Sequence, residues 1–170
     1  MHALMQNTVS AATGCFANFS IPTSVPNADA NDCRAAYLRQ ADSEFVQMLN
    51  GFRSSGGLAR LSEVVALSER RGSLDIAALS GSLARRELIC FEWQSEGWLP
   101  LFQFDPLDMT IRSQVKPVVA DLSCIYGPWD LAFWFSQPNP WLACTAPADS
   151  LLSDLPTVLQ AARADRFVSA

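Results

Sequence analysis

The sequence predicts a mainly α-helical protein with one β-hairpin: a small N-terminal helical unit, a central hairpin and a C-terminal helical region. In several stretches apolar residues recur at spacings of three and four, which is typical of amphipathic helices. The stretch 88–104 instead places aromatic and β-branched residues on both sides of a short polar loop. Because 49% of the 170 residues are apolar, we expect about one domain with a core of its own.

The N-terminal part divides into a tail and a helical region. Residues 1–31 hold small residues and prolines without periodic apolar spacing, so we expect a disordered tail there. The helical region, 32–87, is expected to begin with Asp32 as the N-cap of a first helix. A stop signal at Asn50-Gly51 predicts where that helix ends.

Residues 57–87 predict two or three short helices, since apolar residues from Leu58 onward follow helical spacing. Such a unit can be a helix–turn–helix, in which Arg85 and Arg86 would contact DNA phosphates. It can also be a three-helix structural unit with solvated arginines. We favour the second interpretation, because a recognition helix carries more Arg, Lys, Asn or Gln on one side. The net charge of −5 also argues against a dominant role in nucleic-acid binding.

The stretch 88–104 is interpreted as a β-hairpin whose loop runs from Gln94 to Gly97. Trp93 and Trp98 flank that loop and are expected to pair across the strands. Pro100 has no N–H to donate, so its strand is predicted to be an edge strand or to carry a bulge. Both faces of the hairpin carry apolar groups, which predicts helices packed on at least one side.

Residues 105–170 are predicted to return to helix. A first helix is expected over 112–125, followed by a break at Gly127-Pro128. The next helix is apolar nearly all round and is therefore expected to be central and buried. Further helix starts are indicated at Pro147 and at Ser153 or Asp154, with a last helix over about 155–167.

Composition excludes several classes of function. One lysine and one histidine, His2, leave little room for a His-dependent catalytic triad or a zinc site. Five cysteines without a CxxC pair indicate reduced thiols in a cytoplasmic protein, three of them in the core. No stretch is long and apolar enough to span a membrane, and no signal peptide is indicated. We therefore expect no catalytic residues, no metal site and no cofactor.

The last forty residues carry a series of short motifs. These are a tryptophan helix at 129–135, a turn Pro138-Asn139-Pro140-Trp141-Leu142, a helix start Pro147-x-x-x-Leu151-Leu152 and a closing Ala161-Ala162-Arg163. In order and spacing they resemble the toxin-binding domain of Xre/MbcA/ParS-type antitoxins. The segment Leu99–Asp105 is similar to a Pro-x-Phe-Gln-Phe-Asp element of members that pair with RES-domain toxins. The match covers about residues 80–168, with Ala143 standing where the family usually has glycine.

The resemblance implies a bacterial antitoxin whose partner is a RES-domain toxin, an enzyme with an ADP-ribosyltransferase-like fold that consumes NAD. Family members cover the active-site entrance of the toxin, often with residues of their C-terminal segment. Many also repress their own operon through an N-terminal helix–turn–helix. For this chain the resemblance implies a toxin-binding-like domain at 105–170. The alternatives are a helix–turn–helix transcriptional regulator and an orphan protein-interaction domain, and a homodimer is left open.

Five residues are candidates for the contact with a partner. Trp141 is either a lid on the core or an exposed anchor, and aromatic residues are enriched at interface hot spots. Asn139 either closes its turn through its amide, which we favour, or contacts the partner. Arg163 and Arg166 share a helix face, and two roles are open for them. They can complement the helix dipole, or one guanidinium can enter a toxin pocket built for an anionic dinucleotide. Phe167 completes this set at the end of the chain.

Overall fold

The computed structural model describes residues 28–71 and 76–169. These residues form seven α-helices, three strands and two short 3₁₀ helices. The elements are α1 (Ala28–Gly51), β1 (Leu58–Arg60), α2 (Leu61–Arg71), α3 (Ile76–Ala84), β2 (Phe91–Trp93), β3 (Glu96–Pro100), η2 (Leu101–Gln103), α4 (Val115–Leu122), α5 (Pro128–Ser136), η3 (Pro140–Leu142), α6 (Pro147–Ser150) and α7 (Leu155–Ser169). The predicted class, mainly α-helical with a minor β component, is confirmed. Of the tail predicted at 1–31, residues 1–27 lie outside the described residues.

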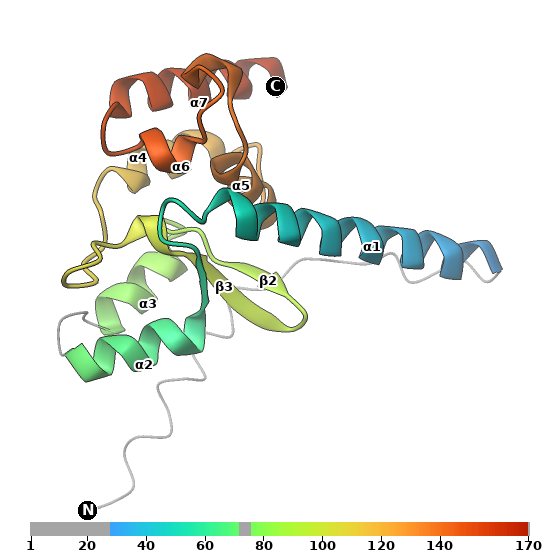
Figure 1. Cartoon of the computed structure of the whole chain (residues 1–170), viewed down its shortest axis with the longest axis horizontal. Helices are drawn as coiled ribbons and strands as arrows, with labels where there is room; N and C mark the ends of the chain where they lie inside the picture. The colour runs from blue at the N-terminus through green and yellow to red at the C-terminus, as the bar shows by residue number, and fades with distance from the viewer. Residues whose placement is uncertain (1–27, 72–75, 170) are drawn as a thin grey trace, which may run out of the picture.

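The first helix begins earlier than the sequence predicted. α1 starts at Ala28 and runs through Asp32, which is therefore not an N-cap. The cause is that residues 28–50 contain neither proline nor glycine, so nothing in the sequence stops helix propagation before Gly51. The N-terminal part of α1 extends beyond the body of the molecule (Figure 1).

The hairpin is part of a three-stranded antiparallel sheet with the strand order β1–β3–β2. β2 and β3 are joined by a two-residue turn at Gln94 and Ser95, both with positive φ, which is shorter than the predicted loop. The third strand, β1, was not predicted, because Leu58 was assigned to a helix. Pro100 ends the central strand and pairs in regular register with Leu58, so the prediction of an edge strand or a bulge is wrong. At the last position of β3 its missing N–H interrupts no continuing ladder.

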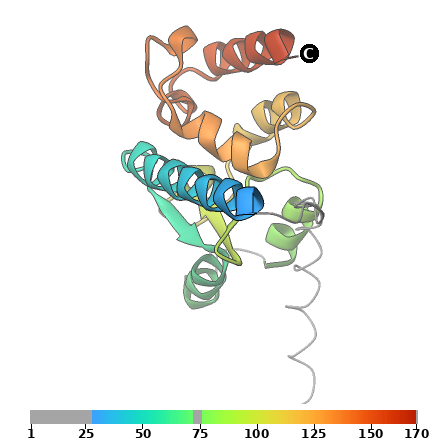
Figure 2. The ribbon, with the colours of Figure 1, turned by 90° about the vertical axis from the view of Figure 1, so that its right-hand side faces the viewer.

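The sheet alternates its side chains between two cores. One face contributes Phe91, Trp93 and Trp98 to the core formed with α1 and the C-terminal helices. The opposite face contributes Leu99 to a second, smaller core formed with α2 and α3. Figures 1 and 2 show α1 and α5 on one side of the sheet and α2 and α3 on the other. Helices therefore cover both faces, as the apolar character of both faces indicated.

Aromatic contacts tie the hairpin to the first helix. The rings of Trp93 and Trp98 meet edge to face at 6.1 Å, which confirms the predicted cross-strand pair. Phe45 of α1 stacks on Trp93 at 3.8 Å and meets Trp98 at 5.0 Å. The sheet thus forms the platform on which α1 lies, and α1 in turn contacts α5.

The C-terminal lobe, residues 115–169, consists of α4 to α7. Its helix starts were largely predicted: Pro128 is the first residue of α5, and Pro147 is the first residue of α6. Asp154 caps α7, since its Oδ1 accepts the Thr157 N–H at 3.2 Å. α4 is shorter than the predicted helix 112–125. α5 buries Leu131, Ala132 and Phe135, and it contacts α1, β2 and α6, which fits the central position expected for it.

Two further predictions have different outcomes. The prediction that three cysteines lie in the core is wrong for the described residues. Cys33, Cys124 and Cys144 are exposed, and Cys90 is half-buried. They lie at positions that apolar patterning does not distinguish, because a thiol is tolerated on either side of a helix or turn.

None of the helices within the described ranges combines the length and apolar content that crossing a membrane requires.

Candidate functional site

The candidate site begins with the turn between α5 and α6. Asn139 organises this turn, because its Oδ1 accepts the Trp141 N–H at 2.9 Å and its backbone carbonyl accepts the N–H groups of Leu142 and Cys144 at 3.0 Å. A bridge between Asn139 and Thr145 closes the loop at its base. Asn139 is 6% exposed. The side chain therefore closes the turn, which is the role that the sequence favoured, and its contact with a partner stays a prediction.

The same turn forces two residues into a left-handed backbone conformation. Ala143 has φ 50° and ψ 40°, and Cys144 has φ 62°. A side chain in this region clashes with the neighbouring carbonyl, which is why glycine is the usual residue there. The departure from the family pattern noted at Ala143 therefore falls at a position where glycine is physically preferred.

Asp165 connects the turn to two helices. This α7 carboxylate accepts the Trp134 indole N–H at 2.6 Å and the Asn139 amide N–H at 3.3 Å, both on Oδ2. It thereby joins α5, the turn and α7 through one side chain. The sequence did not single out Asp165 for this role, because its partners lie 26 and 31 residues away and no local motif marks the pairing.

Trp141 points outward from this hydrogen-bonded turn. It is 64% exposed, whereas the other four tryptophans are half-buried. Trp129 and Trp134 donate their indole N–H groups to Glu44 and Asp165, but the Trp141 indole has no hydrogen-bond partner among the described residues. Of the two interpretations of Trp141, a lid on the core or an exposed aromatic residue, the exposure of the side chain fits the second.

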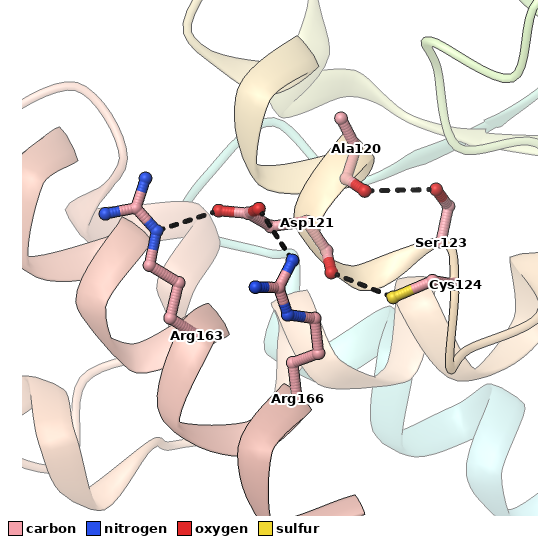
Figure 3. A network of polar contacts seen from close by, with 6 residues as sticks. All are labelled: Ala120, Asp121, Ser123, Cys124, Arg163 and Arg166. Atoms are coloured by element: carbon pink, nitrogen blue, oxygen red, sulfur yellow. Dashed lines mark hydrogen bonds and ion pairs between the residues drawn. The ribbon is translucent and has the colours of Figure 1, made fainter. Parts of the chain in front are cut away.

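Arg163 and Arg166 both contact Asp121 of α4 (Figure 3). Arg163 donates from Nε to one carboxylate oxygen at 3.1 Å, and Arg166 donates from Nη1 to the other at 3.2 Å. The arginine side chains remain 61% and 46% exposed. Because two cations share one anion, the cluster keeps an excess positive charge and further N–H donors on its outer side. The contact of Asp121 with these arginines was not predicted from the sequence, since its partners lie on another helix.

Apolar side chains are exposed on the same lobe. Phe167 near the end of α7 is 88% exposed, and its neighbour Val168 is 84% exposed. Leu152, after α6, is 54% exposed. Together with Trp141 they leave apolar surface uncovered around a lobe whose interior is closely packed.

The residues predicted to contact DNA have a different environment. Arg85 is bound to Glu87 at 2.8 Å, and Lys116 reaches the same carboxylate at 2.9 Å. The hydrogen bonds from Arg85 and then from Lys116 lower the pKa of Glu87 to about 2. Arg86 is exposed and has φ 55°. The connection between α2 and α3, residues 72–75, lies outside the described residues, so the helix–turn–helix hypothesis stays a prediction.

Within residues 28–71 and 76–169, no group of three or more His, Cys, Asp or Glu side chains comes together as a metal site would require. The features that the described lobe does offer are an exposed tryptophan, a cationic cluster and three further exposed apolar side chains. Exposed aromatic residues and arginines are enriched at protein interfaces in general.

Comparisons with known proteins identify no relative of this chain. No family model matches the chain, no curated protein matches it significantly, and no solved structure does so either. The relation to Xre/MbcA/ParS-type toxin-binding domains therefore remains a resemblance carried by the C-terminal motifs and the hairpin end.

Proposed function

We propose that this chain is an antitoxin-like protein that acts in the cytoplasm by binding a RES-type toxin and occluding its NAD-consuming active site. The chain itself performs no chemistry in this proposal. The observation that carries it is the exposure of Trp141 on a turn that hydrogen bonds hold in one conformation. The motifs around this turn are those by which the sequence resembles toxin-binding domains.

The rigidity of the turn supports a role in docking. A partner that covers Trp141 removes a large aromatic surface from water, and such residues dominate many interfaces. Ordering a flexible loop on binding would cost free energy, but here Asn139 and Asp165 already fix the backbone. Most of the binding free energy of Trp141 is therefore available for affinity.

The arginine cluster supports an acidic or phosphate-bearing contact. Arg163 and Arg166 could leave Asp121 at little cost, because exposed ion pairs stabilise proteins by only about 0–1 kcal/mol. Each guanidinium then presents a planar fork that binds carboxylates or phosphates in two contacts. Acidic side chains at the entrance of the toxin's active site would accept such contacts.

Co-expression with a RES-domain toxin encoded beside this chain tests the proposal. We expect the full chain to form a stable complex, restore growth and preserve cellular NAD. The double variant Arg163→Ala/Arg166→Ala should lose much of this protection. Arg34→Ala/Arg39→Ala, which removes two exposed arginines of α1, is the matched control and should protect fully.

The outcomes separate the two parts of the proposal. If residues 163–170 can be deleted without loss of NAD protection, the arginine cluster and Phe167 do not block the active site. If the full chain neither binds the toxin nor preserves NAD, the antitoxin function itself is wrong.

A further inference from the structure

A cavity of about 550 Å³ opens between the sheet side of the molecule and the C-terminal lobe. Its volume lies within the range of sites that hold small molecules, about 300–1,000 Å³. Much of its wall is apolar, with contributions from α2, η2, the turn that follows η2, and the segment after α6. The largest apolar lining residues are Leu67, Leu101, Phe102, Phe104, Met109 and Leu152.

Arg112 is the cation in this cavity wall. Every other arginine whose side chain the structure describes is exposed, whereas Arg112 is half-buried. Its Nε is inaccessible to solvent and has no hydrogen-bond partner within residues 28–71 and 76–169. Its side chain forms no ion pair with a described residue, in contrast to Arg85, Arg163 and Arg166.

Burial of the Arg112 Nε without a hydrogen-bond partner among the described residues is costly. Withdrawing a polar N–H group from water is unfavourable unless a hydrogen bond or an anion compensates. Asp149 also lines the cavity, where its Oδ1 accepts a hydrogen bond from the Ser54 hydroxyl at 2.8 Å, but no ion pair joins it to Arg112. The cavity therefore combines apolar walls with a guanidinium that is not ion-paired to any described residue.

We propose that this cavity binds a small molecule with an apolar body and a carboxylate group. The carboxylate meets the guanidinium of Arg112, and the apolar body lies against the side chains of the wall. A charge-assisted hydrogen bond between arginine and a carboxylate is among the stronger polar contacts in proteins. The inference is independent of the proposed antitoxin function, because it uses neither Trp141 nor the cluster around Asp121.

Octanoate and 1-octanol form a matched pair of probes, since they share an apolar chain and differ in the charged group. Isothermal titration calorimetry of the full chain should show tighter binding of octanoate. Arg112→Met should weaken octanoate binding about tenfold or more and leave octanol binding unchanged. Arg39→Met, which removes an exposed arginine of α1, should leave both affinities unchanged.

A second variant locates the ligand and guards against misfolding of the first. Leu152 is 54% exposed at the cavity wall, so Leu152→Glu adds a carboxylate there with little risk to the fold. We expect it to weaken octanoate binding more than octanol binding, through repulsion between like charges. The proposal is overturned if octanoate does not bind at millimolar concentration, if both probes bind equally, or if either Arg112→Met or Leu152→Glu leaves the affinity for octanoate unchanged.

Discussion

Replacing Asp165 by alanine tests how the turn that carries Trp141 is held. The substitution removes the acceptor of two hydrogen bonds, from the Trp134 indole at 2.6 Å and from the Asn139 amide at 3.3 Å. Hydrogen bonds to a charged group stabilise proteins by about 1.5–3 kcal/mol each. The second bond is long and both are only partly buried, so we expect Asp165→Ala to lower the free energy of unfolding by about 2–4 kcal/mol.

Urea denaturation followed by circular dichroism measures this change without relying on tryptophan fluorescence. Asp149→Ala is the matched control, because it removes an exposed carboxylate of the same lobe whose side chain accepts one bond, from Ser54. The control should cost about 1 kcal/mol or less. A loss for Asp165→Ala no larger than that of the control would refute the idea that this carboxylate fixes the turn.

Three further substitutions have defined outcomes. Gly51→Ala would drive a Cβ into the backbone carbonyl of Ser136, so we expect a loss of about 1–3 kcal/mol in the same urea experiment. Ala143→Gly relieves a left-handed backbone and should raise the free energy of unfolding by about 1 kcal/mol. The hydrogen bond from Arg85 lowers the pKa of Glu87 from 4.5 to about 2, so this carboxylate stabilises the fold above pH 4.5 and ceases to do so as the pH falls towards 2. Glu87→Gln should therefore destabilise the protein at pH 6, and denaturation midpoints should show the difference shrinking between pH 4.5 and 2.

Local signals in the sequence predicted the parts of the fold that depend on neighbouring residues. Pro128 and Pro147 mark helix starts because proline fits the first helical turn, and Asp154 caps α7 because its carboxylate reaches a free N–H three residues on. The hairpin was recognisable from its aromatic residues around a polar turn. In each case the determining interaction lies within a few residues of the signal.

Interactions between distant segments were not predictable in this way. β1 has three residues, and it is a strand only because Ala59 pairs with Leu99 forty residues later. Its apolar spacing fits a helix equally well, so periodicity alone chose the wrong structure. Pro100 was predicted to lie in an edge strand or at a bulge because it has no N–H to donate. The pairing with β1, which no local signal marks, makes β3 the central strand instead.

The candidate site shows the same division. Its surface residues Trp141 and Arg163 could be named from the motifs, whereas the acids that hold the Trp141 turn and contact Arg163 could not. Asp121 and Asp165 act across helices, and their sequence context is that of ordinary solvated residues on a helix. The cavity around Arg112 could not be predicted from the sequence either, because its wall is formed by segments that lie between Ser54 and Leu152.

The affinity of the Trp141→Ala variant for the RES-domain toxin that we propose as the partner tests most directly the proposal that the C-terminal lobe docks another polypeptide. Only about a third of Trp141 is covered in the free chain, so the substitution should cost about 1–2 kcal/mol of stability at most. As a central anchor, its loss should weaken binding by about 2 kcal/mol or more, which is about 30-fold. Leu107→Ala, which truncates an 87% exposed residue outside the lobe, should leave the affinity unchanged. A Trp141→Ala variant that binds the toxin as tightly as the native chain would contradict the account.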